Sequence, residues 1–415
     1  MGAGNPRAGA PAAPALVVAL GIGLGVLYVV AIVVSLHGAA RGDEIYHYAQ
    51  IHLFRHGDFR VLDYYLTTIP GYHLLVAALL WLGGLDTLGA ARAVTALFGL
   101  AAAAGFHALR RRAWQGTETL ATAQFVALPI LAPLFFLVYT DVLALALILW
   151  AAVATLSNRH VLAALALIGV VLVRQNDVVW AAFLGAVAVW PALREHGSAR
   201  WQTSAARLLP YAAPIAVFLG FWAWNGSISL SHGQAALHPE LTLHAGNAFF
   251  ALFLAAALLP LQTLAGLRAF VAHLRARPWL LLLPFAAFAV YWWGFRADNP
   301  YNSALPDFLP RNAFLLKLDH DPAWRAGAGI VMVLAACGLG TTAMRPAATL
   351  WLYPFAALFL ASSWLIEQRY ALVPLVLWLA FREQRGRAIE FATLALWLSL
   401  AVWIFFSVVT GRFFL

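Results

Sequence analysis

The sequence has little charge. Asp, Glu, Lys and Arg make up only 10% of its 415 residues, and 63% are hydrophobic, whereas a soluble domain is usually about 25% charged. This composition excludes a soluble enzyme, a disordered chain and a coiled coil. Cys337 is the only cysteine, which excludes an intramolecular disulfide bond. Lys317 is the only lysine, and this arginine bias in an alanine-rich chain points to a GC-rich, bacterial source.

Long hydrophobic runs are what the sequence has in abundance. A membrane-spanning helix needs about 20 predominantly apolar residues, and we count about 13 such spans, with a range of about 12–14. The chain is therefore predicted to be an all-α polytopic membrane protein with a single domain, 1–415. The predicted spans are residues 15–36, 89–109, 119–139, 141–157, 160–173, 177–193, 208–224, 245–265, 279–294, 326–342, 347–363, 370–381 and 389–409.

Residues 71–85 form an apolar run of only about 15 residues, and Pro70 precedes it. A span there would place the arginines at 110–112 on the outer side, against the positive-inside rule. We therefore predict a helix lying along the outer membrane surface. This prediction extends the first outer loop over 37–87, and the second large outer loop covers 295–325.

The formal net charge is +9, and its distribution argues against a nucleic-acid surface. With the N-terminus inside, most arginines lie in separate inner loops, where they set the topology. The inner loops contain only four acids: Glu118, Glu195, Glu383 and Glu390. Because acids contribute little to topology, their concentration on the outer side calls for another cause.

The first outer loop opens with an adjacent carboxylate pair, Asp43 and Glu44. In a helix, Asp43, His47 and Gln50 would lie on one face. Such a pair could act as a general base, bind a metal or orient an acceptor. The alternative is a solvated helix start, where acidic residues are favoured.

The segment 174–177 places Arg174 and Asp177 within a long apolar stretch. Ionisable groups at membrane depth are candidates for function, and the arginine fork suits phosphate. The alternative is a short outer loop in which Arg174 reaches the interface.

Other polar residues also meet the outer ends of spans. Asp141 could cap a helix, Asp298 and Asn299 precede a proline turn, and Arg369 could reach the interface or bind phosphate. Three histidines, 232, 238 and 244, are spaced by six residues, which matches no metal-ligand pattern. No metal and no cofactor are predicted.

These segments together resemble the eukaryotic dolichyl-phosphate-glucose-dependent alpha-1,2-glucosyltransferase family. The resemblance follows the chain in order from about residue 15 to 410. The matching segments are 43–47 with Asp63, 67–71, 139–142, 174–176, 224–226 with His238, 297–299, and 367–370 with Pro374.

The resemblance implies a GT-C-type glycosyltransferase fold with the active site on the periplasmic or lumenal side. It implies a polyprenyl-phosphate-linked sugar donor, a glycan or lipid-linked glycan acceptor, and transfer with inversion to an alpha-1,2 product. Asp43 is the implied general base, with Glu44 as the second choice. Arg174 and Arg369 would bind the donor phosphate. The sugar and acceptor would contact His47, Asp141, Asn176, His238, Asp298 and Asn299.

The location would be the bacterial inner membrane for a bacterial source, and the ER membrane in the eukaryotic family. A transporter or flippase for an anionic lipid-linked sugar is the alternative function. Transporters often contain internal repeats with matched broken helices, and the sequence has no second copy of the Arg174 segment.

Overall fold

The computed structural model describes residues 14–62, 66–194, 199–232, 242–303 and 311–413. Within these ranges the chain is helical, with one isolated β-bridge between Met344 and Arg382, which confirms the all-α prediction. The α-helices are α1 (Pro14–Leu36), α2 (Glu44–Arg55), α3 (Gly71–Leu82), α4 (Leu88–Ala113), α5 (Glu118–Val126), α6 (Thr140–Leu156), α7 (His160–Val173), α8 (Val179–Leu193), α9 (Ala199–Asn225), α10 (Gly246–Leu258), α11 (Pro260–Ala276), α12 (Leu282–Gly294), α13 (Pro300–Ser303), α14 (Arg311–His320), α15 (Pro322–Gly340), α16 (Leu352–Ala361), α17 (Leu372–Phe381) and α18 (Arg387–Val409). Short 3-10 helices are η1 (Ala132–Phe136), η2 (Gln175–Val178), η4 (Pro278–Leu281), η5 (Ala347–Trp351) and η6 (Gln368–Ala371).

Six helical segments in the described ranges are long and apolar enough to cross a membrane: α1, α4, η2 with α8, α9, α15 and α18. Apolar side chains of α1 face outward: Val18, Ile22 and Val29 have exposures of 59%, 63% and 59%. An extended apolar surface of this kind fits a lipid environment. The chain is therefore a multi-pass membrane protein. The predicted count of about 13 spans is not confirmed, because six further apolar helices have only 10–17 residues.

The predicted span over 119–139 is wrong. Helix α5 ends at Val126, and the chain then forms only the short η1. Pro129 and Pro133 explain the break, because proline lacks the N–H that a continuous helix requires. The broken segment is buried against other helices, with Leu131 and Leu134 almost fully enclosed. Irregular backbone at membrane depth is tolerated where protein surrounds it.

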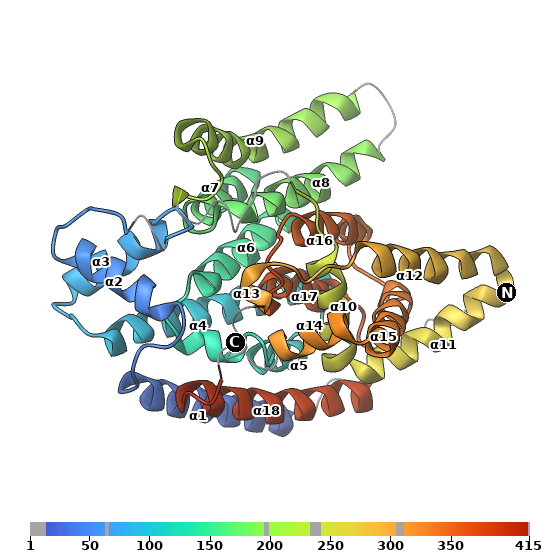
Figure 1. Cartoon of the computed structure of the whole chain (residues 1–415). Helices are drawn as coiled ribbons and strands as arrows, with labels where there is room; N and C mark the ends of the chain where they lie inside the picture. The colour runs from blue at the N-terminus through green and yellow to red at the C-terminus, as the bar shows by residue number, and fades with distance from the viewer. Residues whose placement is uncertain (1–13, 63–65, 195–198, 233–241, 304–310, 414–415) are drawn as a thin grey trace.

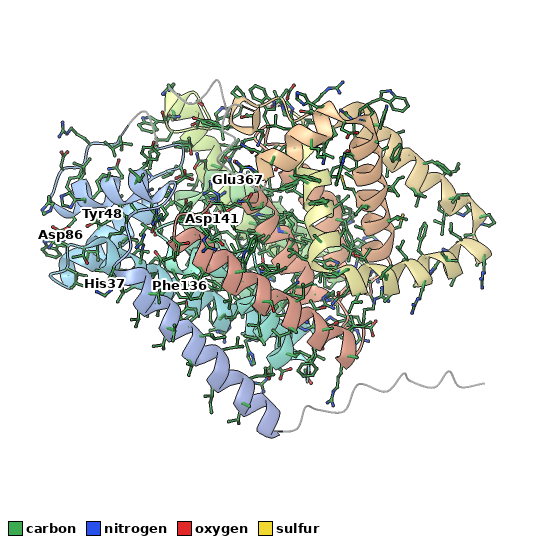
Figure 2. The ribbon with its side chains drawn as sticks, turned by 60° about the horizontal axis from the view of Figure 1, so that its bottom comes forward. His37, Tyr48, Asp86, Phe136, Asp141 and Glu367 are labelled. Atoms are coloured by element: carbon green, nitrogen blue, oxygen red, sulfur yellow. The ribbon has the colours of Figure 1, made fainter. Side chains whose placement is uncertain are left out.

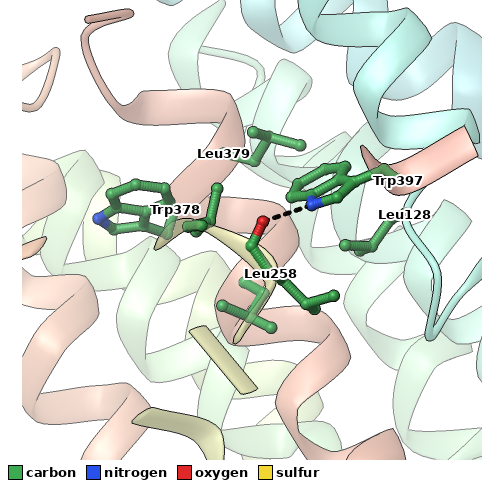
Figure 3. A pocket seen from close by; sticks show the side chains of 7 residues that line it. Leu128, Leu258, Trp378, Leu379 and Trp397 are labelled. Carbon is green, nitrogen blue, oxygen red and sulfur yellow. Dashed lines mark hydrogen bonds between the residues drawn. The ribbon is translucent and has the colours of Figure 1, made fainter. Parts of the chain in front are cut away.

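The predicted span over 245–265 is bent by 104° between α10 and α11. Pro260 starts α11, where its missing N–H costs little. The indole of Trp397 on α18 donates a hydrogen bond of 2.6 Å to the Leu258 carbonyl at the end of α10 (Figure 3). An apolar hollow beside this bond is lined by Leu128, Trp378 and Leu379. This buried end of α10 is therefore satisfied by a side chain.

Helices α6 and α17 lie in the middle of the molecule, with α9 on one side and α1 and α18 on the other (Figure 1). Nearly all residues of α17 are buried. Helices α11 and α15 approach so closely that a Cβ at Gly266 would lie 2.0 Å from the Gly338 carbonyl oxygen. Only glycine permits that contact.

The surface of the first loop is built by α2 and α3. Helix α3 has 12 residues and rises about 18 Å, which is short of the ~30 Å hydrocarbon core of a bilayer. A short helix is therefore present within the predicted range 71–85. Its placement along a membrane stays a prediction.

Alternating helix directions bring polar segments to one end of the bundle. Asp43 precedes α2, Asp141 begins α6, Arg174 ends α7 and Arg369 lies in η6 before α17. The other end of α17 leads into Arg382. The two ends of this buried helix therefore carry two separate groups of charged residues.

Candidate active site

Asp43 stands at the N-terminal end of α2, directly after Gly42, whose φ of 53° allows the tight turn. Its backbone N–H donates to the Tyr139 hydroxyl oxygen at 2.9 Å. Its carboxylate accepts a hydrogen bond of 2.8 Å from Arg369. The Asp43 side chain is 44% exposed. It is thus fixed in place and still accessible.

The electrostatic surroundings of Asp43 favour its ionised form. Burial opposes ionisation, but Arg369, His47 and Arg311 outweigh it and hold the pKa of the Asp43 carboxyl below its ordinary value. The carboxylate is therefore charged at neutral pH.

Glu44 lies in a different environment from its neighbour. It is fully buried, and Arg92 donates to both of its oxygens, at 2.9 and 2.6 Å. The backbone N–H groups of Arg41 and Val138 also donate to this carboxylate. Arg92 in turn donates to backbone carbonyls at the end of α1 and just beyond it, those of Ser35, Gly38 and Ala39. Both oxygens of Glu44 are thus occupied by contacts that hold the loop to α1 and α4.

Arg174 bridges two acids. It donates to Asp141 at 2.8 Å and lies 3.5 Å from Asp177. Asp141 and Asp177 are buried. The second Asp141 oxygen, Oδ2, has no hydrogen-bond partner; a guanidinium nitrogen of Arg369 lies 3.7 Å from it. These four side chains line one small hollow, whose apolar wall includes Phe359 and Leu372.

Arg369 lies between Asp43 and Asp141. One of its terminal nitrogens lies 2.8 Å from both Asp43 and Glu367. Its guanidinium also lies over the Tyr139 ring, 5.1 Å from the centroid. Glu367 and Arg369, two residues apart, can meet because Glu367 is in extended backbone before η6 and not in a helix. Asp141 and Glu367 accordingly lie near one another in Figure 2.

A short buried segment positions Glu367. The Asn247 amide oxygen accepts from the Glu367 N–H at 2.9 Å, and the Asn302 side chain bonds both the N–H and the carbonyl of Ile366. Arg311 lies 3.5 Å from the Glu367 carboxylate. Asn302 and Arg311, which follow α12 in the chain, thus fix the position of Glu367, the partner of Arg369.

His47 faces the same end of the molecule. Its Nδ1 lies 2.9 Å from Nε2 of His73, and its ring packs edge-on against Tyr139. Burial, opposed by Asp43, lowers the pKa of His47 to about 4. His47 is therefore neutral at pH 7.

The remaining predicted site residues are spread out. Asn176 is exposed on η2, next to Gln175, which bonds Thr67 and Ile228 across the loops. Asp298 is exposed and accepts from the Trp364 indole at 2.8 Å. Asn299 is buried in the turn before Tyr301. His238, like Asp63, lies outside the described residues.

Sequence reasoning gave no role to several members of the cluster. Tyr139 and Glu367 lie within the matching segments 139–142 and 367–370, and a polar residue at the end of an apolar run was the available signal. Asp177 was already a candidate together with Arg174. Arg311 belongs to the second outer loop, and nothing in its spacing pointed to the site.

Comparison with known proteins gives two similarities. Residues 41–206 match the DIE2/ALG10 family. This match agrees with the resemblance suggested by the motifs over the part of the chain that it covers. The matched segment contains Asp43, Asp141 and Arg174.

Among solved structures, the chain is similar to ArnT from Cupriavidus metallidurans in the apo state. The identity is 15%, the TM-score is 0.44, and the similarity covers 94% of this chain and 78% of that chain. No curated protein sequence matches the chain.

Proposed function

We propose that the chain is a GT-C-type glycosyltransferase that transfers glucose from a polyprenyl-phosphate donor to a hydroxyl of a glycan or lipid-linked glycan. The transfer inverts the anomeric carbon, as in an alpha-1,2-glucosyltransferase, and takes place on the periplasmic or lumenal side of one membrane domain. One observation carries the proposal. An accessible carboxylate, Asp43, pairs with Arg369, and Arg369 also approaches Asp141, which pairs with Arg174. The family match covers Asp43, Asp141 and Arg174.

Asp43 is the general base of this scheme. Its carboxylate takes the proton of the acceptor hydroxyl while the acceptor oxygen forms a bond to the anomeric carbon. The bond from that carbon to the phosphate oxygen breaks, and the lipid phosphate leaves with the electron pair. Asp43 suits this role better than Glu44, because Glu44 is fully buried and both its oxygens are already paired.

Arg174 and Arg369 bind the donor phosphate. The leaving phosphate is a stable anion, so the protein mainly has to position it and balance its charge. Without donor, Arg369 is paired with Asp43 and weakens it as a base. A phosphate that draws hydrogen bonds from Arg369 reduces this effect. Asp43 therefore becomes a stronger base when the donor is bound.

Asp141 contacts the sugar. Its Oδ2 is a buried carboxylate oxygen without a hydrogen-bond donor, and leaving such a group unpaired is costly. A sugar hydroxyl entering the adjacent hollow would supply the missing donor. His47 lies beside Asp43 as a neutral side chain. Asn176, His238 and Asp298 are proposed to contact the acceptor, and Asn299 to hold the loop that carries Asp298.

The test uses the full chain in lipid nanodiscs with radiolabelled polyprenyl-phosphate glucose and an oligosaccharide acceptor. We expect labelled product from the wild type and a loss of about 10²–10⁴-fold in Asp43→Asn. Asp58→Asn is the matched control, because Asp58 is another acid of the same loop and pairs with Arg60 instead. Equal loss in both variants contradicts the assignment of Asp43. Lipid flipping without any sugar transfer supports the transporter alternative.

A further inference from the structure

A second group of polar side chains lies on the first loop, apart from the arginine cluster. His52 lies in the last turn of α2 and His56 directly follows the helix as its C-cap, four residues on, so both side chains lie on one side of the helix end. Asp86 follows α3 and joins them: one oxygen lies 3.2 Å from His52 Nδ1 and the other lies 3.0 Å from His56 Nε2. The two histidine side chains are 49% exposed and Asp86 is 35% exposed. Asp86 lies at the edge of the molecule (Figure 2).

The geometry of these three residues fits a divalent metal. Zinc binds His nitrogen and carboxylate oxygen at about 2.0–2.2 Å, so two ligands of one tetrahedral ion lie about 3.4 Å apart. The potential ligand atoms of His52, His56 and Asp86 all lie within 4.8 Å of one another. Small side-chain rotations therefore suffice to bind an ion. In the described part of the chain this is the one such group of three.

The backbone around Asp86 presents the carboxylate to α2. Gly84 has a φ of 65°, which turns the chain after α3. The Arg55 side chain donates a hydrogen bond of 2.9 Å to the Leu85 carbonyl, and Thr87 caps α4 by accepting from the Ala90 N–H. Asp86 lies between these two fixed points. The ion pairs of Asp86 in the described residues are with histidines alone.

We propose that His52, His56 and Asp86 form a zinc-type metal site that clamps α2 to the segment between α3 and α4. Two imidazoles and one carboxylate suit Zn²⁺, and solvent would fill the open position. The site plays no part in the sugar-transfer scheme, which uses no metal. Its ligands come from segments 30 residues apart or more, so the ion would hold the two sides of this loop together.

The experiment uses the tag-free full chain in nanodiscs, stripped of metal with EDTA. Cobalt(II) is titrated first, because tetrahedral Co²⁺ absorbs visible light strongly. Zn²⁺ is then added as a competitor. Hydrogen exchange of the segment 83–87 is measured with and without Zn²⁺. The variants are His56→Ala and Asp86→Asn. The control is His273→Ala, an exposed histidine on α11 that bonds only its own helix carbonyl in the described contacts.

We expect one equivalent of Co²⁺ to give a tetrahedral spectrum in the wild type and in His273→Ala. We expect a loss of tenfold or more in affinity in the other two variants. Zn²⁺ should slow hydrogen exchange of segment 83–87 in the proteins that give the tetrahedral spectrum, which are the wild type and His273→Ala. Absence of a spectrum in the wild type overturns the proposal. So does a spectrum that both His56→Ala and Asp86→Asn leave unchanged. Neither result bears on sugar transfer, which is measured separately.

Discussion

The two ends of α17 carry buried charges that are paired in opposite ways. At one end, Glu390 accepts from both arms of Arg382, and Gln124 and the Arg385 N–H complete its coordination. The side chains of Arg382 and Glu390 are 1% and 0% exposed. At the other end, Arg369 pairs with the carboxylates of both Asp43 and Glu367. One oxygen of Asp141 there accepts no hydrogen bond.

This contrast separates a structural ion pair from a site. A buried carboxylate whose two oxygens both accept hydrogen bonds from the protein presents no unpaired oxygen to a ligand. Glu390 is in this state, and so is Glu44 beside Asp43. Asp43 and Asp141 keep an exposed or unpaired oxygen. Burial of charge alone therefore does not mark the proposed active site, which we propose from the accessible carboxylate of Asp43 together with the unpaired oxygen of Asp141.

The largest expected effect is on stability, at the end of α17 where Arg382 pairs with Glu390. Glu390→Gln leaves Arg382 buried without its ionised partner, and breaking such a pair costs about 3–5 kcal/mol. Thermal unfolding in detergent should show this loss. Transfer per folded molecule should stay near the wild-type rate, and a tenfold lower rate would break the contrast.

The next effect is on activity, at the incompletely paired end. Arg369→Met removes the guanidinium that contacts Asp43 and the proposed phosphate contact, so we expect transfer to fall about 10²–10³-fold. Arg369→Lys keeps the charge without the planar fork, so its transfer rate should fall less. The measurement is initial rate at saturating acceptor. A rate for Arg369→Met within threefold of wild type would exclude the phosphate role.

How far the sequence predicts this site is clear from these residues. The sequence singles out Asp43 by its adjacent carboxylate, Arg174 by its place in an apolar stretch and Arg369 by its place at a span end. The structure joins all three through contacts of Arg369 and Arg174 with Asp43 and Asp141. The direct contact of Arg369 with Asp43 joins residues 326 apart. It depends on extended backbone at Glu367, which helical periodicity does not describe. Pro129 and Pro133 in the sequence indicate the helix break after Val126. The continuous apolar character of 119–139 favoured one span instead.

A smaller effect concerns pH. The pKa of His47 is about 4 in the folded chain and 6.5 ordinarily, so between these values the unfolded chain binds more protons. Stability should therefore rise with pH across this window, by at most about 3 kcal/mol. His47→Gln should flatten the rise in melting temperature between pH 4 and 6.5. The matched control is His320→Gln, an exposed position on α14; an unchanged slope in His47→Gln would contradict the burial argument.

The smallest expected effect concerns the unpaired oxygen. Asp141→Asn retains an oxygen for Arg174 and removes the acceptor proposed for a sugar hydroxyl, so kcat/KM for the donor should fall about tenfold. The melting temperature should change little. A large loss of stability with unchanged kcat/KM would assign Asp141 to the framework.

In the proposed mechanism Asp43 is the base, and Glu44 holds the loop to Arg92. The most direct measurement is the single-turnover rate of glucose transfer, per folded molecule, in Asp43→Asn beside Glu44→Gln. Asp43→Asn should keep the wild-type melting temperature within a few degrees and lose about 10²–10⁴-fold in rate. Glu44→Gln should unfold earlier because Arg92 loses its buried partner, and its folded fraction should transfer at nearly the wild-type rate. The reverse pattern, with Asp43→Asn active and folded Glu44→Gln inactive, would contradict the account.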